Sequence, residues 1–301
     1  MPTDLPPAVH GADTGFPFVP SPVLRTRGGT PYLRDPGVHV IARPEVHLAS
    51  LGEFLGGFDQ ALGFADYLED PTPLPPGAQV CKVAGQLCYA SFGPRRTHNR
   101  DARRYFENIL SSGHGSVLEH ACFTLLCYGI SRSVTHELVR HRAGFGYSQL
   151  SQRYVSGKAL RFVERPEYAG DPELHALFEG RVDRASAEYD ELASALVARQ
   201  RAGDGILGGE ARTDLRKKVR QTARSVLPNE TEAPIVVTGN ARAWRHFVEM
   251  RASAHAETEI RALAVRVHGC LAAADRYLFG DYELDPLPDG THAVKTSHPK
   301  V

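Results

Sequence analysis

The continuous apolar run at residues 121–130 (ACFTLLCYGI) constrains the fold more than any other part of this sequence. It is rich in aromatic and branched side chains and much shorter than the roughly 20 residues of a membrane-spanning helix, so it predicts a buried β-strand. Segments with a helical pattern lie on both sides of it, at residues 78–90, 102–112 and 131–141. A core strand between helices indicates a soluble α+β protein with no membrane partner.

Further elements are expected along the chain. Asp171 before Pro172, and Asn240 before Ala241, are typical starts of helices, and GDGILGG at residues 203–209 is typical of a turn. These patterns predict a modest antiparallel or mixed sheet surrounded by helices. The further expected strands are residues 38–41, 160–164 and 236–238, and the further helices are residues 47–68, 171–202, 211–225, 241–250 and 253–277.

The pattern predicts a single domain with additional segments at both ends. Prolines are concentrated before residue 45, so we expect residues 1–37 to form a Pro/Gly-rich N-terminal arm that is poorly ordered or lies on the surface. The domain itself is expected at residues 38–280, after which residues 281–301 form a loose C-terminal tail. Another proline cluster, at residues 71–76, separates the first two helices.

Charge and cysteine content exclude several classes of protein. The 35 basic side chains balance the 35 acidic ones, so no net charge attracts the chain to nucleic acid, and any anion site must be local. The five cysteines are scattered without a CxxC pair, which argues against a disulfide framework and a zinc ribbon. Scattered thiols and the lack of a signal-peptide pattern at the N-terminus predict a cytoplasmic protein.

The helix at residues 131–141 ends in HELVRHR, a sequence that superficially suggests a zinc-binding helix. Two histidines bind one metal ion from a helix when they are four residues apart. His136 and His141 are five apart, so they are separated by about 140° around the helix axis and do not share a face. We therefore expect no metal site.

Three arginines and two serines lie within residues 140–153. Gly144 and Gly146 favour an end to the helix, which makes the segment a loop that can direct Arg140 and Arg142 at one ligand. Such a loop suits a phosphate or pyrophosphate group, because guanidinium groups bind phosphate oxygens in pairs. A solvated basic loop with surface ion pairs is an equally good interpretation of these residues taken alone.

Two other polar segments lie at the edges of expected core elements. Residues 111–120 (SSGHGSVLEH) form a glycine-containing turn directly before the apolar strand, where binding residues often lie. Residues 240–242 begin a helix whose N-terminus favours anions, and Arg251 follows at its end. Taken singly, each of these residues is also typical of a turn cap or of a surface ion pair, which contributes about 0–1 kcal/mol.

Together these segments resemble the flavin-dependent thymidylate synthase family. The shared motifs are Arg-His-Arg at 140–142 with Ser-x-Arg-Tyr at 151–154, preceded by Gly-His-x-Ser-x-x-Glu-His at 113–120. Three more follow in order: Ala-Arg-x-Val-Leu-Pro at 223–228, Asn-Ala-Arg at 240–242 and Arg-Ala-x-x-His-Ala at 251–256. The strong match covers about half of the chain, and an outline match covers residues 38–280.

The resemblance implies a methyltransferase that converts dUMP to dTMP for DNA precursor synthesis. Members of the family bind FAD, reduce it with NADPH and take a methylene group from 5,10-methylenetetrahydrofolate. A hydride from the reduced flavin then completes the methyl group. The family forms homotetramers with active sites between subunits, so the implied partners are dUMP, the folate and further copies of the chain.

By position, the resemblance assigns FAD contacts to the arginine motif, to the turn before the apolar strand and to the helix that Asn240 begins. His114 is implied to lie near both the flavin ring and the folate. The implied FAD residues are His114, Ser116, Glu119, Arg140, His141, Arg142, Ala143, Gln149, Asn240, Ala241, Arg242 and His246.

The implied dUMP site adds the serine motif and two distant arginines. Arg251 is the implied catalytic residue, since a guanidinium beside the uracil stabilises negative charge as N3 loses its proton. Such activation requires no cysteine nucleophile, and none of the five cysteines has the Pro-Cys-His setting of the other class of thymidylate synthase. The implied dUMP residues are Glu137, Arg140, Gln149, Leu150, Ser151, Gln152, Arg153, Arg224 and Arg251.

Two departures from the family pattern affect the expected site. Residues 143–150 separate Arg-His-Arg from the serine motif, which is one residue more than the family usually has, and we expect the extra residue within 143–146. Glu137 occupies a position where the family often has Gln, which changes the character of a nucleotide contact there.

Two other functions compete with dUMP methylation. A flavoprotein with the same scaffold could have lost methylation through its altered 143–146 loop and retained only flavin oxidation. A non-catalytic nucleotide- or RNA-binding protein could use the same arginine loops, although the zero net charge and the lack of an aromatic RNA-stacking motif count against RNA.

Overall fold

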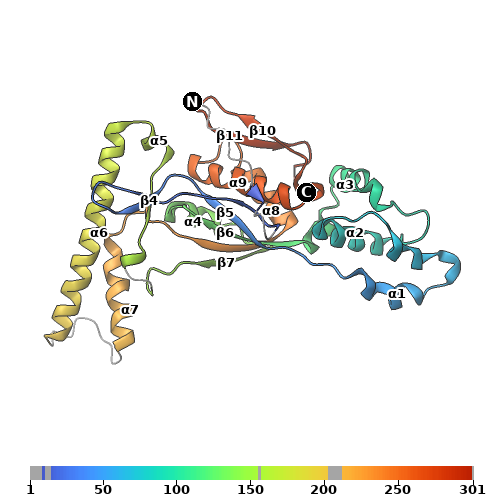
Figure 1. Ribbon diagram of the computed structural model, residues 1–301, viewed down its shortest axis with the longest axis horizontal. Helices are drawn as coiled ribbons and strands as arrows, with labels where there is room; N and C mark the ends of the chain where they lie inside the picture. Colours follow the sequence, from blue (N-terminus) through green and yellow to red (C-terminus); the bar gives the residue numbers. More distant parts are fainter. Residues whose placement is uncertain (1–8, 11–14, 155–156, 203–211, 300–301) are drawn as a thin grey trace.

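The centre of the protein is a six-stranded antiparallel sheet (Figure 1). The computed structural model describes residues 9–10, 15–154, 157–202 and 212–299. Within these residues the strand order is β1-β2-β5-β6-β9-β7, with every neighbouring pair antiparallel. The strands are β1 (Val9–His10), β2 (Pro17–Val19), β5 (Gly37–Ala42), β6 (Cys122–Tyr128), β7 (Phe145–Gln149) and β9 (Ile235–Asn240).

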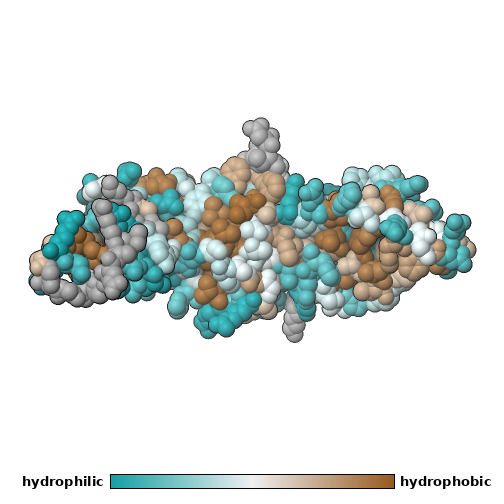
Figure 2. All heavy atoms as spheres, turned by 90° about the horizontal axis from the view of Figure 1, so that it is seen from below, coloured by the Kyte–Doolittle hydropathy of each residue, from teal (hydrophilic) through white to brown (hydrophobic). Residues whose placement is uncertain are grey.

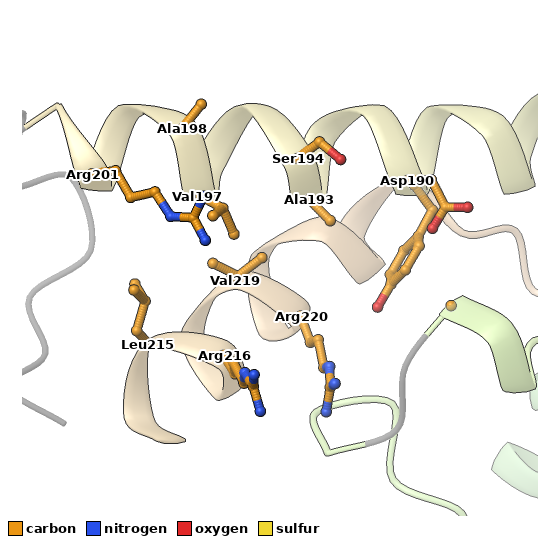
Figure 3. A pocket seen from close by; sticks show the side chains of 12 residues that line it. Asp190, Ala193, Ser194, Val197, Ala198, Arg201, Leu215, Arg216, Val219 and Arg220 are labelled. Carbon is orange, nitrogen blue, oxygen red and sulfur yellow. The ribbon is translucent and has the colours of Figure 1, made fainter. Parts of the chain in front are cut away.

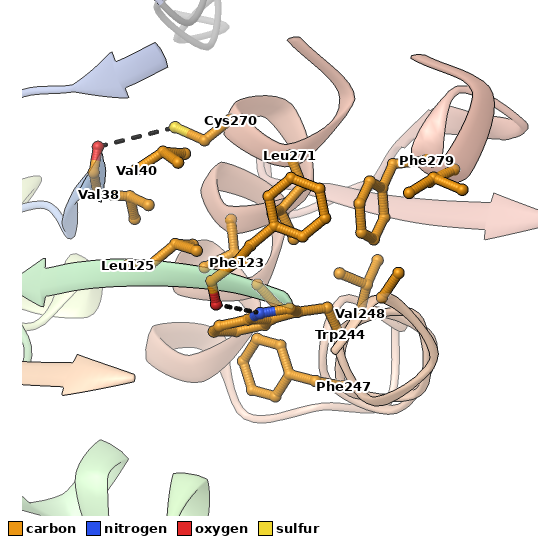
Figure 4. Close-up of a cluster of buried hydrophobic side chains, with 14 of the residues drawn as sticks. Val38, Val40, Phe123, Leu125, Trp244, Phe247, Val248, Cys270, Leu271 and Phe279 are labelled. Atoms are coloured by element: carbon orange, nitrogen blue, oxygen red, sulfur yellow. Dashed lines mark hydrogen bonds between the residues drawn. The ribbon is translucent and has the colours of Figure 1, made fainter. Parts of the chain in front are cut away.

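The predicted apolar strand is confirmed as β6, near the middle of this sheet. Alternate residues of β6, among them Phe123 and Leu125, are fully buried, as the two-residue period of a strand requires. Figure 4 shows them packed with Trp244 and Leu271 from two helices. The indole nitrogen of Trp244 donates to the Phe123 carbonyl at 3.2 Å, so the one polar atom of this side chain is satisfied within the core.

Helices surround the sheet in three groups (Figure 1). α8 and α9 cover one face, the long α6 and α7 lie side by side at one end, and α1 to α3 lie at the other end. The helices are α1 (Gly52–Gly56), α2 (Pro76–Cys88), α3 (Ala102–Ser111), α4 (Arg132–Leu138), α5 (Pro166–Ala169), α6 (Pro172–Arg201), α7 (Arg212–Ala223), α8 (Ala241–Arg251), α9 (Thr258–Ala274) and α10 (Arg276–Phe279). The expected α+β class is thereby confirmed.

Both predicted helix starts are confirmed. The Asp171 carboxylate accepts from the backbone N–H groups of Glu173 and Leu174, and Asn240 accepts from Ala243 at 2.8 Å. The expected single helix at residues 47–68 is wrong: α1 is five residues long and is flanked by short 3₁₀ turns. Gly63, with φ of 62°, interrupts the segment, because the left-handed conformation favours glycine and ends a helix.

The expectation that the segment before residue 37 contributes no core element is also wrong. β2 pairs with β5, while β3 (Leu24–Arg25) and β4 (Pro31–Leu33) form a second sheet with β8 (Phe162–Val163). Val19, Tyr32 and Leu33 are buried. Pro17 and Pro31 are the first residues of their strands, a position where the missing N–H of proline is tolerated.

The C-terminal segment is a hairpin rather than a loose tail. β10 (Tyr282–Pro286) and β11 (His292–Thr296) are antiparallel, and the backbone N–H of Val294 donates to Ala252 at the end of α8. The expected turn at residues 203–209 lies outside the described residues. Among the residues that the structure describes, no helix is long and apolar enough to cross a membrane.

Figure 2 shows apolar surface gathered near the middle of the molecule and toward the end that carries α1. At that end Phe54, Phe58 and Leu62 are all exposed, and the rings of Phe54 and Phe58 make a T-shaped contact.

Candidate active site

The arginine motif lies in the turn between α4 and β7. Ser131 caps the start of α4, which ends at Leu138, so Arg140, His141 and Arg142 follow the helix. The turn is held from β7, where the Tyr147 hydroxyl donates to the carbonyls of Leu138, at 3.1 Å, and of His141. The expected end of the helix is confirmed, but the segment that follows is an edge strand rather than a continuous loop.

Gly144 accommodates the close approach of this turn to α8. Its φ is +76°, and a Cβ atom there would lie 2.9 Å from both Ala243 Cβ and Asn240 Nδ2. The Gly144 carbonyl accepts from the Asn240 N–H at 3.3 Å. The long spacer is thus folded into a turn that only glycine fits without strain.

Arg251, in the last turn of α8, reaches the same turn from the opposite side. Its Nη1 donates to Glu137 Oε2 at 2.9 Å, and its Nε donates to His141 Nε2 at 3.0 Å. Together with Arg140, Arg142 and neighbouring side chains, Arg251 and His141 line a cavity of about 510 Å³. Three guanidinium groups around one cavity make a strongly cationic site.

Burial, together with the neighbouring Arg251, His246 and Arg140, lowers the pKa of the His141 imidazole to about 4. His141 is therefore neutral at neutral pH. Its ring lies 5.4 Å from that of Phe247 and 5.8 Å from that of His246.

A second cavity, of about 490 Å³, adjoins the first at Ala143 and His246. It lies over the N-terminus of α8, where the helix dipole favours anions. Glu119 and Arg242 form an ion pair at its rim, and both are about half exposed. Asn240 and Gly144 also line it.

Most of the residues assigned to FAD by the resemblance line these two cavities. His114 and Ser116 are exposed at the start of the 3₁₀ turn η5 (Gly115–His120), which abuts Arg242 at Gly115. Ala241 is fully buried and its N–H donates to Ala121, so its N–H is already occupied. The FAD residues that line a cavity are Glu119, Arg140, His141, Arg142, Ala143, Asn240, Arg242 and His246.

The residues assigned to dUMP form two groups. Glu137, Arg140 and Arg251 lie at the α4 turn, whereas Gln149 and the serine motif lie at the other end of β7, about 14 Å farther along the strand. Within one described chain the structure does not bring these two groups together.

At the far end of β7, the Ser151 hydroxyl accepts from the Arg153 N–H at 3.3 Å, and Leu150 pairs with Pro234. Arg224 begins the turn η7 (Arg224–Val226), directly after α7. Arg153 Nε and Gln152 Nε2 are buried without a hydrogen-bond partner among the described residues. Buried donors in proteins usually have an acceptor, so these two nitrogen atoms are suited to donate to a bound ligand.

Sequence reasoning missed the cations that α7 contributes at this end. Arg216, Lys217 and Arg220 line a cavity of about 380 Å³ together with Arg153 and Tyr154. Lys217 Nζ lies 5.3 Å from the centre of the Tyr154 ring. The run RKKVR at residues 216–220 was the signal that could have indicated them.

A cavity of about 810 Å³, larger than either cavity beside α8, lies between α6 and α7 and contains none of the predicted site residues. Figure 3 shows Val197 from α6 facing Val219 from α7, with Arg216 and Arg220 nearby. Polar and apolar side chains both line it, but it shares no lining residue with the two cavities beside α8, so size does not locate the chemistry.

None of the five cysteines is among the residues that line the two α8 cavities. All five are free, and burial raises the pKa of Cys81, Cys127 and Cys270 to about 12, which makes them poor nucleophiles. Cys88 and Cys122 are exposed. No group of three or more metal-ligating side chains is found in the described part of the chain.

Fold and site together define an α+β protein in which arginine-lined cavities meet a capped helix N-terminus. This construction is typical of proteins that bind nucleotides and their phosphates.

Comparison with known proteins identifies the family. The family model described as "Thymidylate synthase complementing protein" matches residues 71–274, which include every predicted site residue. A flavin-dependent thymidylate synthase from Mycobacterium sp. (strain KMS) is 48% identical over 220 residues, covering 73% of this chain and 85% of the relative. Relatives with the same name are 44% identical over 218 residues in Mycobacterium leprae (strain Br4923), covering 72% and 85%, and 43% identical over 240 residues in Mycobacterium avium (strain 104), covering 78% and 93%.

The chain belongs to the flavin-dependent thymidylate synthase family and is an enzyme of the methyltransferase class. The resemblance stated from its motifs is thereby confirmed.

Proposed function

We propose that this enzyme converts dUMP to dTMP, using FAD, NADPH as reductant and 5,10-methylenetetrahydrofolate as methylene donor. The observation that carries the proposal is Arg251, held by Glu137 and His141 at the edge of a cationic cavity. The proposed role in DNA precursor synthesis, and the free thiols, favour action in the cytoplasm.

The two cavities beside α8 fit FAD by their chemistry. The pyrophosphate carries two negative charges, which suit the Arg140 and Arg142 guanidinium groups and the N-terminus of α8. Because the two cavities adjoin, they can hold an extended dinucleotide. When bound and reduced, FAD supplies the hydride that completes the methyl group.

Arg251 activates the uracil by electrostatics. A guanidinium beside the pyrimidine favours its N3-deprotonated form, and the negative charge then makes C5 a nucleophile toward the methylene carbon. No sulfur adduct is required. The high pKa of the three buried thiols supports this cysteine-free route.

We further propose that the enzyme is a homotetramer with shared active sites. Gln149 to Arg153 lie roughly 14 Å along β7 from the turn that holds Arg251, so we assign them, together with Arg224, to the dUMP site of another copy. β7 is an edge strand of the described sheet, so a second copy can approach there and supply Ser151, Arg153 and Arg224 to the first copy's Arg251.

The flavin test separates this proposal from its rivals. The purified enzyme is expected to be yellow, with a flavin spectrum that bleaches under NADPH and recovers in air. A protein unable to take up FAD would contradict the proposal and favour a non-catalytic nucleotide-binding protein. Bleaching without tritium release from C5-labelled dUMP would indicate a flavoprotein that has lost methylation.

A further inference from the structure

His141 and Arg251 are 110 residues apart in sequence and meet at the wall of the first cavity. The contact joins Arg251 Nε and His141 Nε2 at 3.0 Å. An arginine side chain has only donors, so Nε2 must accept and the single ring proton must lie on Nδ1. The contact therefore requires a neutral imidazole.

The charges around this ring favour the same state. Arg140 faces it from the turn after α4, and His246 and Arg251 face it from α8, while the Glu137 carboxylate binds Arg251. Burial and these three neighbours of the ring lower the pKa of His141 to about 4. A protonated ring would place a second cation 3.0 Å from the guanidinium and would remove the acceptor.

The acceptor is also fixed in space. The ring packs edge-on against Phe247, which is fully buried, at 5.4 Å. Its own backbone carbonyl accepts from the Tyr147 hydroxyl of β7. The ring packing and the backbone hydrogen bond thus fix the position of Nε2. His141 binds Nε of Arg251, whereas Glu137 binds its Nη1.

We propose that His141 is a positioning residue whose neutral Nε2, together with Glu137, orients Arg251 for catalysis. Two-point attachment prevents the guanidinium from turning and leaves one N–H of Nη1 and both N–H groups of Nη2 for the substrate. This inference rests on the proposed function of Arg251. It assigns the side-chain nitrogen of His141 to Arg251, whereas the resemblance assigns His141 only to FAD.

The test compares two variants of the holoenzyme. His141→Phe keeps an aromatic ring and loses the acceptor, so we expect kcat for dTMP to fall by roughly 100-fold, as for a catalytic group that is displaced by about 1 Å. His141→Gln places an acceptor at a similar reach, and we expect activity within about tenfold of the parent enzyme. FAD affinity is expected to change far less than kcat in both variants. His136→Phe, an exposed histidine on α4, is the matched control.

Loss of FAD to the same extent in both variants would overturn the inference and make the ring a flavin ligand. Full activity of His141→Phe would also overturn it, provided that Arg251→Ala is inactive. Absence of dTMP formation by the parent enzyme would instead contradict the proposed function, and the inference would be lost with it.

A second measurement observes the tautomer of His141 directly. We expect ¹⁵N NMR of histidine-labelled holoenzyme at pH 7 to show one neutral imidazole in the Nδ1–H form, absent from the spectrum of His141→Gln. A protonated ring or the Nε2–H form at this residue would overturn the inference.

Discussion

Gly144 turns the chain within the spacer between the arginine and serine motifs. With φ of +76°, it turns the chain against the N-terminus of α8, and its carbonyl accepts from Asn240. The register of β7 against β9 then runs without interruption from Phe145 to Gln149. The turn at Gly144 therefore forms part of the wall of the proposed FAD site and leaves the strand intact.

We predict that Gly144→Ala weakens FAD binding by about tenfold or more. The left-handed backbone costs an alanine roughly 1–2 kcal/mol, and the new methyl group would press on Ala243 and Asn240. The measurement is a titration of the apoenzyme with FAD, followed by flavin fluorescence.

Gly146→Ala is the matched control. A Cβ atom at Gly146 would meet nothing within 4 Å, and its φ is not in the left-handed region, so its FAD affinity should match that of the parent. Equal effects of the two substitutions would contradict the role assigned to Gly144.

At the scale of elements, the sequence predicted the features that depend on residues close together in the chain. The caps at Asp171 and Asn240 are correct, because their partners lie two or three residues away. β7 was not predicted, because Gly146 and Ser148 suit a loop and only pairing with β9 makes the segment a strand. β2 and β4 were missed for a similar reason, since their prolines suggested an arm.

The candidate site was likewise predicted where its residues lie within short motifs. Motifs identified most of the residues that line the two cavities, including those on α8. The pairing of Arg251 with His141 spans 110 residues and depends on how α8 packs against the α4 turn, which the sequence does not reveal.

A lysine of α2 is buried against the turn η4 (Asn99–Asp101). Lys82 is fully buried, its Nζ donates to Asn99 Oδ1 at 2.9 Å, and the ring of Tyr67 lies 5.7 Å away. Burial, opposed by Asp70 and aided by Arg96, lowers the pKa of Lys82 from 10.5 to about 8.

We predict that Lys82 makes the free energy of unfolding increase between about pH 8 and pH 10. Between the folded pKa, about 8, and the unfolded pKa, 10.5, the unfolded chain binds more protons at this site, so the free energy of unfolding rises with pH. The contribution is at most roughly 3 kcal/mol. Lys82→Met should lack this rise in denaturation midpoints measured from pH 7.5 to 10.

The exposed Lys295 provides the control, since Lys295→Met should retain the pH dependence of the parent. The same pH dependence in Lys82→Met and the parent would contradict this account of the α2 contact.

At the scale of the whole molecule, the proposed dUMP site is shared between copies of the chain. We predict that Arg251→Ala and Arg224→Ala are each inactive. Mixed tetramers of the two variants should recover about one quarter of the parent activity. A shared site is intact only when the copy that supplies Arg251 and the copy that supplies Arg224 are each unmodified at that position. The measurement is dTMP formation after the two variants are co-expressed and purified through separate tags. Mixed tetramers without activity would contradict a shared site.

The proposed methylation of dUMP depends most directly on Arg251. The decisive measurement is dTMP formation by the purified enzyme with FAD, NADPH and 5,10-methylenetetrahydrofolate, compared with Arg251→Ala and with the exposed control Arg103→Ala. We predict dTMP from the parent and from Arg103→Ala, and a loss of at least about 100-fold in Arg251→Ala with FAD still bound. Undiminished dTMP formation by Arg251→Ala, or none by the parent enzyme, would contradict the account.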